Sequence, residues 1–179
     1  MVAGMRIREA LLFAVLIKVA HCGQSDSRAK QSEDISQFYS DSANIRTLNT
    51  TLDKSDCKVD VVRKRSSHDV AFNRQYTSRT HRSSVEVVGK FMNTRRSMGS
   101  ASFDAMDVEK NGRYSSHERL LHVFDHGNCG IFYVTDNWGR RGNDYELRVK
   151  NGNNGRGNCY NQLKSDTKRA GVFSRLKAC

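Results

Sequence analysis

Short hydrophobic runs separated by polar clusters make up most of the chain after residue 44. The runs are rich in β-branched and aromatic residues, with polar residues partly alternating between them; they span 59–62, 70–76, 85–91, 120–124, 131–134 and 145–149. Clusters of Gly, Asn, Asp and Ser lie between runs, at 98–100, 110–112, 126–128 and 139–143. Regularly spaced short strands with such turn signals predict an all-β sandwich or barrel, in which 139–143 forms a hairpin loop.

Helical spacing flanks this β-rich region. Ile35, Phe38 and Tyr39 lie three and four residues apart, which predicts a short helix over 34–42. A second apolar series with the same spacing starts at Cys159 and predicts a C-terminal helix that ends near Gly171. The pattern therefore indicates a barrel or sandwich with a helix at each end. A closed antiparallel barrel of about eight strands can enclose one small ligand.

The first 22 residues have the pattern of a secretory signal peptide. Arg6 and Arg8 precede an apolar run over 10–20, and a small-residue stretch ends at Cys22. We expect cleavage after Cys22, which leaves 23–179 as one extracellular domain. A buried N-terminal helix is the alternative for this segment. The run is shorter than the roughly 20 apolar residues that a membrane span needs, so we expect no membrane span.

Four cysteines would remain in the mature chain: Cys57, Cys129, Cys159 and Cys179. An even number in a secreted chain predicts two disulfides, in any of three pairings. Because the cysteines lack the C-x2-C spacing of zinc sites, we expect no bound metal. The sequon Asn49-Thr50-Thr51 is a candidate glycosylation site.

The chain is strongly basic, with a formal net charge of +11. Removal of the signal peptide would lower this charge to about +9. The basic residues either form an ordinary solvated surface or bind heparan-like polyanions. Nucleic-acid binding is not expected, because no recognition module is present and the chain would be secreted. Motifs such as G-x-S-x-G or H-E-x-x-H are missing, so the sequence indicates neither an enzyme nor a cofactor.

The last third of the chain carries a series of motifs. Asp125–Val134 reads DHGNCGIFYV, a Gly/Asn-rich loop follows, and then come Tyr145-Glu146-Leu147, Asn158-Cys159 and the final Cys179. This series resembles the tick salivary lipocalins of the histamine-binding protein family, which have a D-x-x-N-C-x-[VI]-x-[YV]-V block, a loop, Y-E-L-W and two further cysteines. The resemblance covers 114–179, extends loosely to 35–57, and leaves 58–91 unmatched.

The resemblance implies an eight-stranded antiparallel lipocalin barrel with a C-terminal helix. It also implies one disulfide pairing, Cys57 with Cys179 and Cys129 with Cys159. The first pair would close a long loop and contribute roughly 4 kcal/mol in the chain-entropy account of disulfides.

The resemblance also implies a function. Members of this family are secreted into the feeding wound, where they sequester host mediators such as histamine, serotonin or leukotrienes; some bind a complement protein instead. We therefore predict a secreted carrier of a host small molecule that suppresses inflammation and host defence, with a biogenic amine as the leading ligand. The alternatives are an anionic lipid mediator such as a leukotriene, and a protein- or glycosaminoglycan-binding surface without a barrel ligand.

Buried carboxylates and aromatic walls are what a cationic amine needs inside a barrel. The family's Glu of Y-E-L-W corresponds to Glu146, which faces either the cavity or solvent. A family aromatic corresponds to Tyr114. Phe103, Asp104 and Asp107 lie in the segment that would supply a second carboxylate and a ring; the alternatives are core packing for the Phe and turn polarity for the aspartates.

Three departures leave this amine pocket incomplete. Arg148 stands where the family has the Trp of Y-E-L-W, Gly130 where an acidic residue often follows the cysteine, and Leu48 where an aromatic is expected in the first strand. A positive field also concentrates anions and repels amines. This positive field favours an anionic ligand, such as a fatty-acid-derived mediator, or a polyanionic surface.

Overall fold

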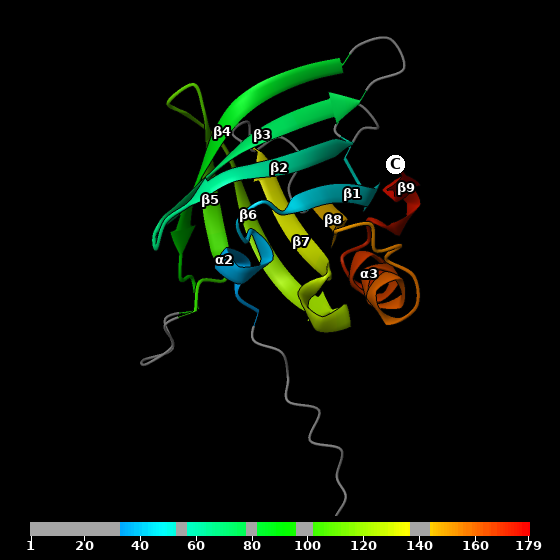
Figure 1. Cartoon of the computed structure of the whole chain (residues 1–179). Coiled ribbons are helices and arrows are strands. Elements are labelled where there is room, and N and C mark those ends of the chain that lie inside the picture. Colours follow the sequence, from blue (N-terminus) through cyan, green and yellow to red (C-terminus); the bar gives the residue numbers. More distant parts are fainter. Residues whose placement is uncertain (1–32, 53–56, 78–81, 96–101, 137–143) are drawn as a thin grey trace, which may run out of the picture. The chain divides into compact units, whose positions relative to one another are not determined.

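The computed structural model describes residues 33–52, 57–77, 82–95, 102–136 and 144–179. The predicted signal peptide and the predicted hairpin loop at 139–143 lie outside these ranges. The elements are, in order, α2 (Ile35–Phe38), β1 (Asn44–Thr50), β2 (Lys58–Arg65), β3 (Asp69–Thr77), β4 (Arg82–Met92), β5 (Ala105–Lys110), β6 (Arg113–Phe124), β7 (Cys129–Asp136), β8 (Asp144–Lys150), α3 (Asn158–Arg169) and β9 (Lys177–Ala178), with short 3-10 turns at Asp125–Gly127 and Phe173–Arg175 (Figure 1).

Eight strands close into an antiparallel barrel. Each strand from β2 to β8 pairs with the next, β8 pairs with β1, and residues 44–46 of β1 pair with 59–61 of β2 to complete the ring. The predicted fold class is confirmed. The segment 58–91, which the resemblance left unmatched, forms β2, β3 and most of β4.

Apolar side chains and α2 fill one end of the barrel. α2 is shorter than the predicted 34–42, because the chain must turn at Ser42, with φ 59°, to enter β1 at Asn44. Asp34 caps the helix, and its Oδ1 accepts a hydrogen bond from Ser36 N at 2.9 Å. The helix packs on inward-facing apolar residues of the strands, among them Ile45, Val62, Val70, Phe72, Leu120 and Phe132.

α3 covers the outer face of β7 and β8. Leu147 and Val149 of β8 point outward and pack with Leu163 of α3 in a second apolar cluster. Since side chains alternate along a strand, the neighbours of Leu147 point into the barrel. The strand pattern of β8 thus places the carboxylate of Glu146 and the guanidinium of Arg148 inside the barrel.

Two disulfides tie the C-terminal region to the barrel. Cys129 of β7 is bonded to Cys159 of α3, and Cys57, next to β2, is bonded to Cys179 after β9. These are the two pairs that the resemblance implies. The Cys57–Cys179 disulfide links residues 122 positions apart in sequence.

Candidate functional site: a buried ion layer across the barrel

Six charged side chains point into the barrel above the apolar end. They come from four strands and are all buried: Lys58 and Asp60 of β2, Arg74 of β3, Glu118 of β6, and Glu146 and Arg148 of β8. We call this set the ion layer. Each member lies two residues from another inward-facing residue of its strand, as the alternation of side chains requires.

The ion layer is a continuous chain of ion pairs. Arg74 binds Asp60 through Nε at 2.7 Å and Glu118 through Nη1 at 2.8 Å. Arg148 contacts the other oxygen of Glu118, and its Nε donates to Glu146 Oε2 at 2.7 Å. These contacts join neighbouring strands and also opposite walls, because β3 and β6 are separated in the sheet by β4 and β5. The layer therefore crosses the interior of the barrel.

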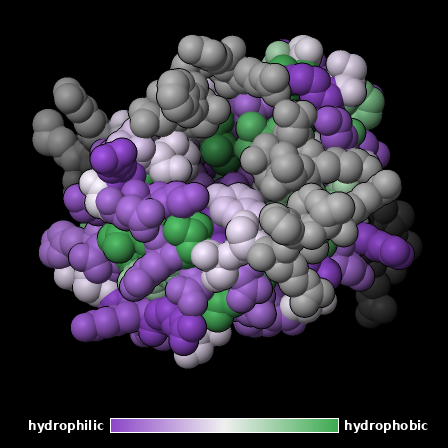
Figure 2. All heavy atoms as spheres, turned by 90° about the horizontal axis from the view of Figure 1, so that it is seen from above, coloured by the Kyte–Doolittle hydropathy of each residue, from purple (hydrophilic) through white to green (hydrophobic). Residues whose placement is uncertain are grey.

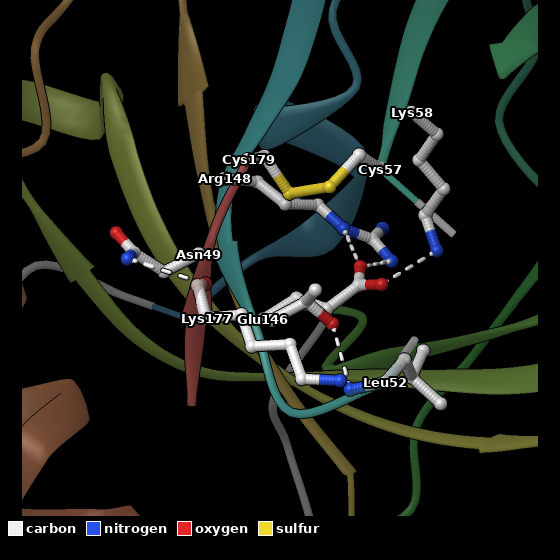
Figure 3. Close-up of a disulfide and its surroundings, with 9 residues drawn as sticks. Asn49, Leu52, Cys57, Lys58, Glu146, Arg148, Lys177 and Cys179 are labelled. Carbon is white, nitrogen blue, oxygen red and sulfur yellow. Dashed lines mark hydrogen bonds and ion pairs between the residues drawn. A yellow bond between two sulfur atoms is a disulfide. The ribbon is translucent and has the colours of Figure 1, made fainter. Parts of the chain in front are cut away.

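Glu146 is held from two sides. Its Oε1 accepts a hydrogen bond from Lys58 Nζ at 2.8 Å, while Arg148 occupies Oε2. Figure 3 shows both cations directed at this carboxylate, beside the Cys57–Cys179 disulfide. The Glu146 side chain is fully buried, with 0% exposure. Its carboxylate already has the positive partners that an inward-facing charge needs.

Aromatic rings support the layer from the apolar side. The guanidinium of Arg148 lies 4.3 Å from the centre of the Phe132 ring, and that of Arg74 lies 5.1 Å from the Phe72 ring. The Tyr39 hydroxyl donates to Asp60 Oδ2 at 2.8 Å and accepts from Arg148 Nη1 at 2.7 Å. Burial raises the pKa of Tyr39 well above its usual value, so this hydroxyl keeps its proton.

The surroundings of Glu118 decide its charge. Burial alone would raise the pKa of this carboxyl, but Arg148, Arg74 and Lys58 outweigh that effect and hold the pKa well below its usual range. Lys58 behaves differently: burial lowers the pKa of its ammonium group, and Glu146 only partly offsets this. Three cations and three carboxylates therefore balance in the layer, and Lys58 is the cation that burial destabilises.

The other predicted ligand residues do not join Glu146. Phe103 stacks on Phe91 with ring centres 5.7 Å apart and packs against the apolar core. Asp104 is buried beside it, and its two oxygens accept hydrogen bonds from Thr94 N and Thr94 Oγ1, both at 2.6 Å. Both residues lie near the end that α2 covers, since Phe103 O accepts from Ile35 N at 2.8 Å.

Asp107 and Tyr114 lie farther from the interior. Met106 and Val108 of β5 point into the core, so Asp107 points outward, where it accepts from His117 Nδ1 at 2.8 Å. Tyr114 is 41% exposed. A ligand role for these two residues stays a prediction; neither belongs to the ion layer.

Asn49, the predicted glycosylation site, lies within β1 and is half-buried. Its amide nitrogen is 3.4 Å from the carbonyl oxygen of Lys177. Thr51, the third residue of the sequon, is buried and donates to Asp144 Oδ1 at 2.9 Å. Glycosylation of Asn49 stays a prediction.

Sequence reasoning missed five members of the ion layer. A signal was present, because Arg74 follows Val70 and Phe72, and Glu118 precedes Leu120, at spacings of two that put each charge on the apolar face. A charge in such a position is rare unless it has a buried partner. The partner could not be identified, because it lies on another strand.

Among the described residues, no helix is long and apolar enough to cross a membrane. A scan against protein-family models found no match, and neither did a search of curated protein sequences. Solved structures do resemble the chain. A bovine odorant-binding protein (a deswapped triple mutant) is 11% identical with a TM-score of 0.54, over 75% of this chain and 90% of that one.

Two lipocalin allergens are similar to the same extent. The dog protein is 11% identical with a TM-score of 0.55 over 75% of this chain and 90% of its own. The bovine allergen Bos d 2 is 10% identical with a TM-score of 0.52, over 75% and 89%. At such identities the likeness concerns the fold. The chain has the lipocalin fold, a closed eight-stranded antiparallel barrel followed by a C-terminal helix.

Proposed function

We propose that this protein is an extracellular carrier that captures a small amphipathic molecule in its barrel, and that this ligand bears an anionic group. The fold supports a binding protein rather than an enzyme, and one structural neighbour is named for binding odorants. The main support for an anionic rather than a cationic ligand is that Glu146 is already paired with both Lys58 and Arg148.

A cationic amine would have to displace these partners. Its ammonium group would lose its hydration on burial, and that loss is compensated only by a carboxylate that can turn toward it. Glu146 would release Lys58 or Arg148 to do so, which weakens the pairing of a buried cation: among the described residues, Lys58 would keep only its 4.0 Å approach to Glu118, and Arg148 would keep a single carboxylate partner. Exchanging one buried cation for another gains little and adds the desolvation of the ligand.

An anion meets the opposite situation. Lys58 has three N–H donors, and within the described residues its close contacts are one hydrogen bond to Glu146 and a 4.0 Å approach to Glu118. An anionic group near Lys58 would also raise the pKa of that ammonium group and so oppose the lowering that burial causes. The net charge of the proposed mature chain, about +9, raises the local concentration of anions. The view from above shows hydrophobic residues among a mostly hydrophilic surface, which an apolar tail could contact (Figure 2).

A biogenic amine is the second candidate, and one observation favours it. Two carboxylates, Glu118 and Glu146, are fully buried inside the barrel, which is the minimum that an amine pocket requires. If histamine or serotonin binds and Glu146→Gln lowers its affinity at least tenfold, the amine function replaces the anionic one. Unchanged amine affinity in that variant would remove Glu146 from the amine site.

The biological role follows from the tick-lipocalin resemblance. We propose secretion after removal of residues 1–22 and sequestration of a host mediator, such as a leukotriene, to suppress inflammation and defence. The two disulfides support an oxidising compartment. Binding of heparan-like polyanions through the basic surface is a separate function, which retention on heparin beyond that on a sulfonate resin of equal charge density would support.

Titration calorimetry tests the proposal. The purified protein is titrated with a leukotriene, a long-chain fatty acid, the methyl ester of the same fatty acid, histamine and serotonin. We expect saturable binding of the two acids, weaker binding of the ester, and no measurable binding of the amines. Equal affinity for acid and ester, or binding of amines alone, would contradict an anionic ligand.

A further inference from the structure

The wall of the barrel has an opening where β1 changes its partner. Residues 44–46 of β1 pair with 59–61 of β2, whereas residues 49–50 pair with β9 along the same edge. The opposite edge of β1 is occupied by β8. Residues 47–48 therefore lie between the two pairings, at the point where β2 leaves β1.

A pocket of about 280 Å³ fills this opening. Thr47 and Leu48 line it from β1, and Lys58 and Val59 line it from β2. The Cys57–Cys179 disulfide closes the third side. The volume is slightly below the range of roughly 300–1,000 Å³ that is common for small-molecule sites, and it suits a head group with the first part of an apolar chain.

The buried hydroxyl group of Thr47 indicates that a hydrogen-bond partner binds beside it. The residue is only 2% exposed, and its hydroxyl oxygen is buried without a hydrogen-bond partner in the described part of the chain. Buried hydroxyl groups in native proteins almost always have a partner, which is protein, water or ligand. Thr47 faces Arg148 across the β1–β8 pairing, so its side chain lies on the inner face, next to the ion layer.

Both charged side chains that line the pocket are cationic. Lys58 lies on the inner side, is 6% exposed, and gives one of its three donors to Glu146. Arg46 is exposed on the outer side. An anion that approaches through the opening thus meets a positive charge at the rim and a second one inside. Leu48, Val59 and the disulfide supply apolar walls between them.

We propose that this lateral pocket binds the carboxylate head of the amphipathic ligand, with hydrogen bonds donated by Lys58 Nζ and Thr47 Oγ1. The inference rests on the proposed anionic ligand and specifies where its charge is held. It completes the hydrogen bonding of Thr47 and uses a spare donor of Lys58. The ligand's head would then lie in the wall between β1 and β2. Figure 3 shows Lys58 next to Cys57 of the disulfide, with its ammonium group directed at Glu146.

The test is a cycle of two variants and two ligands, measured by calorimetry with palmitate and methyl palmitate. Thr47→Val keeps the shape of the side chain and removes only the hydroxyl, so we expect an unchanged or higher midpoint of thermal unfolding. Palmitate affinity should fall about 3- to 10-fold in Thr47→Val and about 10- to 100-fold in Lys58→Met. Affinity for the ester should fall less than 2-fold in Thr47→Val.

Two control variants match these changes away from the pocket. Thr167→Val removes a buried hydroxyl from α3, and Lys110→Met removes an exposed lysine from β5. Neither should change palmitate affinity. If Lys58→Met does not fold, Thr47→Val decides the question alone.

The outcomes separate this inference from the proposed function. If the wild-type protein prefers palmitate to its ester but Thr47→Val binds palmitate with wild-type affinity, the head lies elsewhere and the lateral pocket holds only water. If the wild-type protein does not distinguish acid from ester, the proposed anionic ligand itself is wrong. If Thr47→Val binds palmitate more weakly and the ester as before, the result supports both the anionic ligand and the lateral pocket as the site of its head.

Discussion

Removing one charge from the ion layer should destabilise the protein severely. Glu118→Gln keeps the size of the side chain but leaves three buried cations with two carboxylates. Glu118 is fully buried and contacts Arg74 at 2.8 Å and also Arg148. Because both arginines are themselves buried, water cannot replace the lost carboxylate. Breaking such a buried pair costs about 3–5 kcal/mol.

This free energy corresponds to a large change in the midpoint of thermal unfolding. For a domain of this size, 1 kcal/mol shifts the midpoint by roughly 2–4 °C, so Glu118→Gln should lower it by roughly 6–20 °C. Circular dichroism at pH 7 with both disulfides intact measures the shift. Glu109→Gln is the matched control, because Glu109 pairs with the exposed Lys90 on the surface and the change should cost less than ~1 kcal/mol.

The effect should depend on pH in a defined direction. The pKa of Glu118 in the folded protein lies well below the value of about 4.3 expected in the unfolded chain. Its stabilisation is therefore complete above the unfolded pKa and is lost as the pH falls through the folded pKa. The difference in unfolding midpoint between the wild-type protein and Glu118→Gln should become smaller below about pH 4. A Glu118→Gln shift no larger than that of Glu109→Gln at pH 7 would refute the ion layer as described.

Three further changes test other parts of the structure. Replacing Cys57 and Cys179 by alanine should lower the free energy of unfolding by about 4–5 kcal/mol in the chain-entropy account, measured by urea denaturation; a loss below ~1 kcal/mol would mean that the pair does not constrain the chain. Gly130→Ala should destabilise by about 1–3 kcal/mol, since a Cβ there would lie 2.9 Å from a Phe38 ring carbon and 3.0 Å from Leu120; an unchanged urea midpoint would contradict this packing. Asp104→Asn should cost about 1.5–3 kcal/mol at pH 7 by weakening the hydrogen bonds from Thr94 and the ion pairs with Arg119 and Arg95. This cost should be smaller below about pH 4, because the pKa of Asp104 is lowered in the folded protein: burial raises it, but the Thr94 hydrogen bonds and the two arginines together outweigh burial. A cost in unfolding free energy that does not change with pH would argue against this carboxylate pairing.

The positions of strands and helices could be predicted from sequence because they depend on local periodicity. Alternation over runs such as 131–134 and 145–149 indicates strands, and the spacing from Cys159 indicates α3; the structure has β7, β8 and α3 at these places. Helix α2 ends earlier than the pattern suggests, because the turn into β1 depends on strand pairing. The disulfide pairing came only from the resemblance, since four cysteines by themselves allow three pairings.

What the sequence alone determined about this protein is thus its β-rich class, the helices at either end, the even cysteine count and the basic charge, all of which depend on residue types and local spacing. Only the tertiary structure decided that Glu146 faces Lys58 and that Glu118 meets Arg74 and Arg148. The physical reason is that a charged residue in a strand has no local signal for a partner that lies on another strand. The partner, and the opening beside Thr47, exist only once β1 closes the ring against β2 and β8.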